Sequence, residues 1–129
     1  MDIAKIRPIL EKESLFLKSK YPDHTMCFIH TKHKNSIKLD KNKYILNNTL
    51  TLSDLLKSLK IKLNIEKNHV IYFKINDQKI SSDDMLLSIK DILNKLNNNN
   101  DNHNYVIIEL CRYTKYLNKA LNILTLGIL

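Results

Sequence analysis

The sequence predicts one α+β domain in which a four-stranded sheet packs on a single central helix, with a further helix at the N-terminus. Three features of the 129-residue chain lead to this prediction. Its hydrophobic share of 43% is enough for one core without disulfides. Leucines at helical spacing cross the middle of the chain. Short runs of β-branched and aromatic residues lie on both sides of these leucines.

Residues 1–20 predict a helix that extends the domain at its N-terminus. Its apolar face is expected to contain Ile9, Leu10, Phe16 and Leu17. Tyr21-Pro22-Asp23 ends this helix, because the residue before a proline disfavours helical backbone angles and Pro-Asp favours a turn.

Two strands are expected next, over residues 25–31 and 43–47. The first is mostly apolar, so its length rather than its periodicity favours a strand. In the second, Tyr44 and Leu46 share one face because side chains alternate along a strand.

The clearest element is a helix over residues 52–63. Thr51 and Asp54 stand at the spacing of a capping box, which marks a helix start. Five leucines then recur three and four residues apart, at Leu52, Leu55, Leu56, Leu59 and Leu63. This stripe is expected to face the core.

The second half of the chain predicts a strand, a short helix and a last strand. Residues 69–75 are mostly β-branched and aromatic, residues 82–96 carry apolar residues at helical spacing, and residues 105–111 are mostly apolar. Two strands, a long helix across them and two further strands form the β-grasp order. The expected divisions are a helical extension over 1–20, a β-grasp domain over 21–111 and a tail over 112–129.

Composition excludes several kinds of site. The single glycine, Gly127, excludes phosphate loops and dinucleotide fingerprints, which need several glycines for close approach of the backbone. Cys27 and Cys111 are too few for a disulfide framework, and in apolar strands they are expected to be inert. No secretory leader and no membrane span is expected. Nor do we expect a cofactor, a metal site or enzymatic activity.

The net charge of +8 favours acidic partners, such as acidic peptides, anionic lipid surfaces or nucleic acid. A simpler alternative is a solvated basic face in a chain rich in lysine and asparagine. Binding to nucleic acid would need exposed aromatic residues between the basic ones, whereas the six tyrosines are scattered. A basic nucleic-acid-binding domain is therefore the least favoured class.

Four segments carry a resemblance to a known family. They are Lys20-Tyr21-Pro22-Asp23, Leu39 to Leu46, Leu50-Thr51-Leu52 and Val70 to Asn76. In this order and at nearly constant spacing, they resemble the Lys-Tyr-Pro-Asp signature, the Asp-Lys-Lys-Lys-Tyr-Leu-Val segment, the helix start and the Phe-rich strand of the autophagy-related protein 8 family. That family includes the GABA-receptor-associated proteins. The resemblance covers about residues 13–111.

The resemblance implies a ubiquitin-like protein that binds others in autophagy. Family members bind receptors through short Trp/Phe/Tyr-x-x-Leu/Ile/Val motifs, which add as a strand to the sheet edge. A processing protease exposes a C-terminal glycine, through which they are conjugated to phosphatidylethanolamine. The implied partners are motif-bearing receptors and adaptors, conjugation enzymes and this membrane lipid. The implied location is the cytoplasm, with recruitment to autophagosomes or other vesicles.

The resemblance also implies a docking groove along an edge strand from Lys43 to Leu46. A first anchor pocket would be lined by Glu13, Leu17, Met26, Phe28, Lys43 and His103. A second anchor pocket would be lined by Tyr44, Leu46, Leu50 and Leu55. The acidic residues that often precede such motifs would be held by Lys41, Lys43 and Lys62. Met26 and Asn47 stand where the family usually has proline, and Ser58 where it has an aliphatic residue, which would reshape both pockets.

The C-terminus leaves conjugation open. The family's conjugated glycine would fall near Lys115, where there is none, but cleavage after Gly127 would expose a glycine. One alternative is a ubiquitin-like interaction module that is never conjugated, whose apolar tail packs on the domain or touches a membrane. Another is a modifier like autophagy-related protein 12, which the Lys-Tyr-Pro-Asp segment disfavours.

Overall fold

The computed structural model describes residues 2–32, 37–97 and 103–114. The elements in chain order are α1 (Ile3–Lys20), β1 (His24–His30), β2 (Lys43–Asn47), α2 (Leu52–Lys62), β3 (His69–Ile75), β4 (Gln78–Lys79), α3 (Ser82–Met85), α4 (Ile89–Leu96) and β5 (Tyr105–Thr114). The strands form one sheet in the order β2-β1-β5-β3-β4. This confirms the predicted α+β β-grasp architecture. The sheet has one strand more than predicted, because the two-residue β4 pairs with the end of β3.

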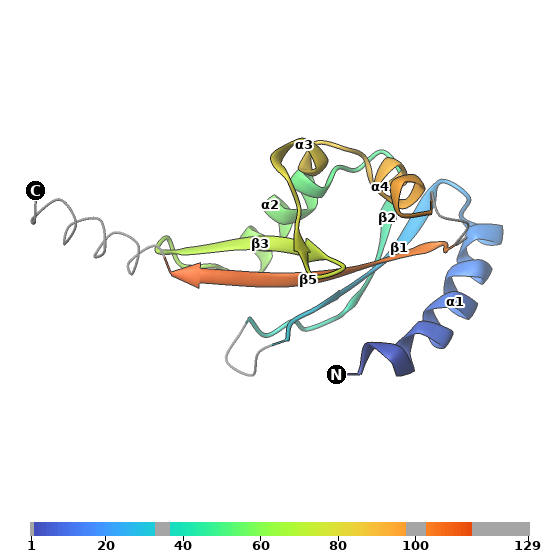
Figure 1. The fold of residues 1–129 in the computed structure, drawn as a ribbon, viewed down its shortest axis with the longest axis horizontal. Coiled ribbons are helices and arrows are strands. Elements are labelled where there is room, and N and C mark those ends of the chain that lie inside the picture. The colour runs from blue at the N-terminus through green and yellow to red at the C-terminus, as the bar shows by residue number, and fades with distance from the viewer. Residues whose placement is uncertain (1, 33–36, 98–102, 115–129) are drawn as a thin grey trace, which may run out of the picture.

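The sheet is mixed and lies between two layers of helix. β1 pairs in parallel with β5 at the centre, and the other neighbours pair antiparallel. Figure 1 shows α2, α3 and α4 on one face of the sheet and α1 on the other. Because side chains alternate across a strand, β1 supplies Cys27 and Ile29 to the α2 side and Met26 and Phe28 to the α1 side.

The larger core lies between the sheet and α2. The side chains of Leu52, Leu55 and Leu59 are buried there against Ile71 and Phe73. At the helix start, the Thr51 hydroxyl accepts a hydrogen bond from the Asp54 N–H at 3.1 Å. The predicted helix, its cap and its leucine stripe are therefore confirmed.

Helix α1 buries Leu10 and Leu17 of its predicted apolar face, but not Ile9 and Phe16. Asp2 caps it by accepting a hydrogen bond from the Ala4 N–H. Its inward side chains are Ile3, Ile6, Leu10, Ser14 and Leu17, spaced three and four residues apart. Ile9 and Phe16 were predicted on this face but are 51% and 65% exposed, because each lies one position off that spacing. Neither α1 nor any other described helix is long and apolar enough to cross a membrane.

The predicted helix over residues 82–96 is two helices. Ser88 begins the second, since its hydroxyl accepts a hydrogen bond from the Asp91 N–H at 3.2 Å. The Ile89 N–H donates to the carbonyl of Leu50 at 2.7 Å instead of continuing the first helix. A tertiary backbone contact therefore breaks the helical repeat. The last strand also runs three residues past its predicted end at Cys111, to Thr114.

The cap of α2 gives a prediction about stability. Replacing Thr51 with Ala is expected to lower the free energy of unfolding by about 1 kcal/mol, because the Asp54 N–H loses its acceptor. Replacing Thr51 with Ser keeps the hydroxyl and is the matched control. Urea unfolding followed by circular dichroism measures both variants. Equal losses in the two variants would contradict a capping role.

Candidate functional site

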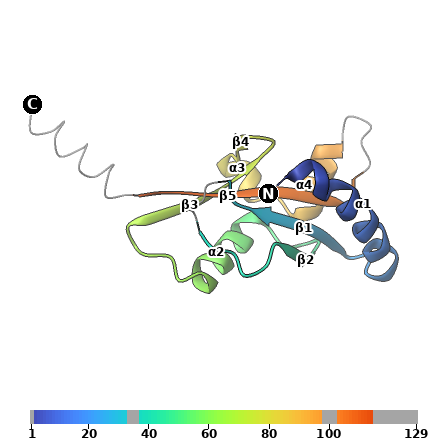
Figure 2. The ribbon, with the colours of Figure 1, turned by 90° about the horizontal axis from the view of Figure 1, so that it is seen from below.

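In the part of the chain that the structure describes, strand β2 forms a free edge of the sheet. It pairs with β1, and Figure 2 shows it beyond β1 on the side away from β5. In this antiparallel pair the hydrogen bonds alternate, so Tyr44 and Leu46 direct their backbone groups to β1. The backbone N–H and C=O groups of Lys43 and Ile45 then point away from the sheet. Such groups are available to pair with another extended chain.

An apolar groove lies beside this edge, on the face that α1 covers. It has a volume of about 500 Å³. Its lining residues come from α1, β1 and β2, namely Lys12, Glu13, Phe16, Leu17, Met26, Lys43 and Ile45. The side chains of Phe16 and Ile45 are 65% and 49% exposed. Large apolar side chains that gather in one exposed hollow are typical of a binding surface.

A charged pair borders the apolar groove. The ammonium of Lys43 donates a hydrogen bond to the carboxylate of Glu13 at 2.9 Å, and the two side chains are 45% and 41% exposed. An exposed pair of this kind contributes little to stability. A charged group on a ligand can therefore replace either partner of this pair.

A second group of predicted residues lies on the opposite face of β2. Tyr44 and Leu55 are buried in the larger core, and Leu46 and Leu50 pack against it while half-buried. The ring of Tyr44 lies beneath two ammonium groups, that of Lys41 at 4.7 Å and that of Lys62 at 5.6 Å from its centroid. Burial raises the pKa of the Tyr44 hydroxyl, with the Asp40 carboxylate adding to the effect.

The structure gathers some of the predicted first-pocket residues and separates others. Glu13, Leu17, Met26 and Lys43 together line the apolar groove. Phe28 is instead buried beneath α1, beside Leu10 and Tyr105. His103 lines a separate hollow at the start of β5, where its ring lies 5.1 Å from that of Tyr105. The predicted conjugation residue Gly127 lies outside the described residues.

Sequence reasoning missed three lining residues of the apolar groove: Lys12, Phe16 and Ile45. Ile45 was recognisable, because Tyr44 and Leu46 already occupy the core face of β2 and an apolar residue between them must face outward. Phe16 was wrongly assigned to the buried face of α1. The position of Leu10 and Leu17 relative to the sheet decides which face of α1 is buried.

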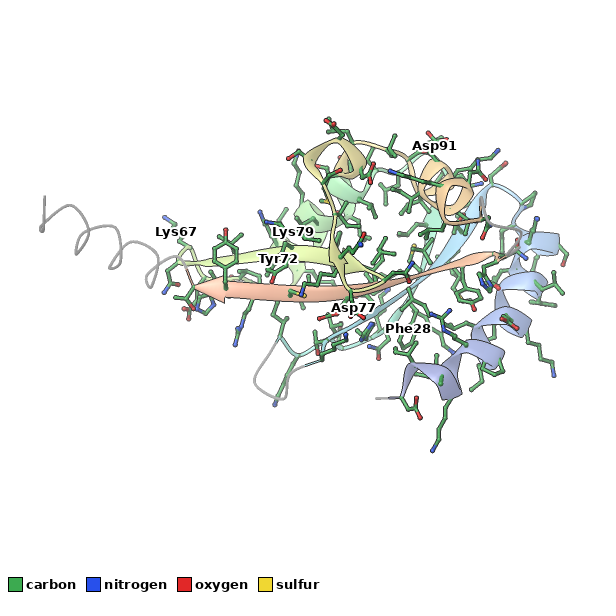
Figure 3. The ribbon with its side chains drawn as sticks, in the orientation of Figure 1. Phe28, Lys67, Tyr72, Asp77, Lys79 and Asp91 are labelled. Atoms are coloured by element: carbon green, nitrogen blue, oxygen red, sulfur yellow. The ribbon has the colours of Figure 1, made fainter. Side chains whose placement is uncertain are left out.

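Another charged cluster lies away from the apolar groove, near the turn between β3 and β4. The Lys32 ammonium pairs with Asp77, which Figure 3 labels, and, at 3.4 Å, with the buried Glu109. Burial lowers the pKa of the neighbouring His30 despite the Glu109 carboxylate, which raises it. Lys32 thus pairs with both carboxylates of the cluster. No group of three His, Cys, Asp or Glu suited to a metal ion occurs within residues 2–32, 37–97 and 103–114.

The fold and its free edge define a class of protein, the ubiquitin-like β-grasp proteins with an N-terminal helix on the outer face of the sheet. A family model described as "Autophagy protein Atg8 ubiquitin like" matches residues 10–115. The chain therefore belongs to the Atg8 family of ubiquitin-like autophagy proteins.

One solved structure supports the same fold. The crystal structure of Trypanosoma brucei ATG8 matches with a TM-score of 0.66 and 15% sequence identity, over 83% of this chain and 88% of that one. At this identity the likeness concerns the fold alone. No curated protein matched the chain.

The two cysteines allow a test of thiol reactivity. Burial raises the pKa of Cys27 to about 12, and burial with the neighbouring Glu109 carboxylate raises that of Cys111 to about 11. At pH 8 the thiolate of Cys111 is then about a hundredfold scarcer than that of an unperturbed thiol. We expect alkylation of Cys111 to rise about tenfold per pH unit from pH 7 to 10.

Mass spectrometry of alkylated peptides measures this profile for each cysteine. Glu109→Gln removes the negative charge next to Cys111 and should increase its alkylation, with no change at Cys27. A plateau for Cys111 near pH 9 in the wild-type protein would show that the pKa is not raised.

Proposed function

We propose that this Atg8-family protein is a non-enzymatic docking adaptor that binds short Trp/Phe/Tyr-x-x-Leu/Ile/Val motifs of autophagy receptors along the free edge of β2. One observation carries the proposal, namely that the apolar groove lies directly beside backbone groups that point away from the sheet and have no strand partner among the described residues. Lys43 and Ile45 contribute both their backbone to the edge and their side chains to the groove. An extended peptide can therefore gain backbone hydrogen bonds and bury an apolar side chain at once.

The first anchor of the motif, an aromatic side chain, enters the apolar groove. Phe16 from α1 and Ile45 from β2 flank it, and the half-buried Leu17 and the buried Met26 form its floor. Burying a large aromatic side chain supplies most of the binding energy in interfaces of this kind.

The second anchor lies three residues later, on the opposite face of the extended peptide. Side chains alternate, so residues separated by an odd number of positions lie on opposite faces. With the first anchor on the α1 face, the second lies on the α2 face, next to the half-buried Leu46 and Leu50. These residues follow Lys43 along the strand, so the peptide runs parallel to β2.

Basic side chains at the start of β2 favour motifs preceded by acidic residues. Lys41 and Lys62 lie together over Tyr44, and Lys43 is paired with Glu13. An acidic flank would approach Lys41 and would compete with Asp40 for Lys62 and with Glu13 for Lys43. Such rim charges act mainly on the rate of association and on specificity.

A proline at the free edge tests strand addition. The Ile45 N–H points away from β1, so Ile45→Pro removes one hydrogen-bond donor for the peptide without breaking the sheet. Ile45→Ala shortens the same side chain but keeps the N–H. We expect the proline variant to bind a Trp-x-x-Leu peptide at least fivefold more weakly than the alanine variant, in line with one lost hydrogen bond of about 1 kcal/mol.

Calorimetric titration measures both affinities, and thermal unfolding verifies that the proline variant is folded. Equal affinity in the two folded variants would remove strand addition from the proposal. Binding unaffected by either change would place the peptide elsewhere on the molecule. Affinity for RNA that falls steeply with salt would instead favour a nucleic-acid partner.

Conjugation to phosphatidylethanolamine is a separate step and needs its own test. It would use Gly127, which is the only glycine of the sequence and is followed by two residues. In this proposal a processing protease removes Ile128 and Leu129, and the exposed glycine is joined to the lipid. The adaptor then moves between the cytoplasm and the autophagosomal membrane.

Intact-mass analysis decides between the conjugated and unconjugated forms. Incubation with the family's processing protease is expected to leave a chain that ends at Gly127. Gly127→Ala is the matched control and is expected to keep its full mass. An unchanged wild-type mass would mean that the protein docks its partners without a lipid.

A further inference from the structure

Another hollow, distinct from the one beside His103, continues the apolar groove past the end of β2. It has a volume of about 290 Å³ and shares Leu17, Met26 and Ile45 with the groove. Its other walls come from the C-terminal part of α1, the start of β1, the residues after β2, and α4. We call it the basic hollow, because the charged side chains in its lining, Lys18 and Lys90, are both basic.

The charged residues that line the basic hollow are both positively charged. Lys18 and Lys90 line it, and no Asp or Glu is among the described residues that do so. The Nδ1 atom of His24 is buried there without a hydrogen-bond partner within the described part of the chain. A buried polar atom without a partner costs free energy.

The walls of the basic hollow are held in place by hydrogen bonds. The Asn48 side chain accepts one from the Thr25 hydroxyl at 2.6 Å, and its backbone N–H donates to the carbonyl of Asp23 at 2.8 Å. The Lys90 N–H donates to the carbonyl of Asn48 at 3.3 Å, which links α4 to the end of β2. The hollow is thus organised before any ligand arrives.

Strand geometry brings one residue of a docked motif to this hollow. In an extended peptide parallel to β2, the residue two positions after the aromatic anchor returns to the α1 face. It lies about 7 Å further along the strand. From the apolar groove this direction leads past Ile45 toward Asn48, where the basic hollow opens.

We propose that the basic hollow is a specificity subsite for an acidic side chain, a glutamate two residues after the aromatic anchor of the docked motif. This inference rests on the docking function proposed above. Glutamate fits better than aspartate because its longer side chain reaches from the strand edge toward Lys18 and Lys90. Its carboxylate would accept charge-assisted hydrogen bonds from these ammonium groups. A lysine at this position would meet like charges.

Three peptides that differ only at this position test the subsite. They carry Trp-x-Glu-Leu, Trp-x-Gln-Leu and Trp-x-Lys-Leu in the same flanking sequence. Because Lys18 and Lys90 are exposed, we expect the glutamate peptide to bind the full-length protein only about three- to tenfold more tightly than the lysine peptide. The glutamine peptide should lie between them.

Reversing the charge of Lys90 in α4 tests whether the basic hollow causes the preference for the glutamate peptide. Lys90→Glu is expected to abolish or invert the order of the glutamate and lysine peptides. Lys67→Glu makes the same change in net charge at the opposite end of the molecule (Figure 3) and should leave the order intact. Lys18→Glu repeats the test from the other wall, in case Lys90→Glu disturbs α4.

The outcomes separate this subsite from the docking function. Equal affinity of the three peptides for the wild-type protein would overturn the subsite and leave docking intact. If Lys67→Glu removes the preference for the glutamate peptide as fully as Lys90→Glu does, the preference depends on net charge. That result would also overturn the subsite. Failure of all three peptides to bind would overturn the docking function together with the subsite.

Discussion

Burial of β1 on both faces is the constraint on which the rest of the structure depends. Six of its seven residues are buried, although it is only one strand away from the edge of the sheet. Cys27 and Ile29 need a layer of helix on one side, and Met26 and Phe28 need another on the other side. The first layer is built around α2. Helix α1 provides the second, which covers β1 and the start of β5.

The apolar groove follows from the way α1 meets this requirement. The helix directs Leu10 and Leu17 inward to cover Phe28 and Met26, and its next row of side chains then falls beside β2. Phe16 therefore lies next to Ile45 with neither of them buried. Each exposed apolar side chain forgoes the free energy that burial in the core would give. A partner that covers both would recover it, which is the physical basis of the docking proposed at this edge.

Charged side chains lie at both ends of the apolar groove. The two groups differ in whether their basic residues are paired with acidic ones. At one end Lys43 is paired with Glu13 and Lys62 lies 3.7 Å from Asp40, so a ligand must compete for them. At the other end the described lining of the basic hollow includes no acidic residue. Because all these side chains are largely solvated, each contributes modestly, and their effect is greater on the choice of partner than on total affinity. The net charge of +8 is thus only a coarse guide to the partner.

The sequence by itself determined the fold class and, through the family resemblance, four of the seven residues that line the apolar groove. Local rules were sufficient for α2, because the Thr51 cap and the leucine stripe depend on neighbours along the chain. They also placed Lys43 to Leu46 on a strand. Only the tertiary structure decided that α1 turns Phe16 outward, that a backbone bond to Leu50 begins α4 at Ile89, and that His103 lies apart from the groove. These features depend on how elements distant in the sequence pack together, and hydrophobic periodicity within one element does not encode that packing.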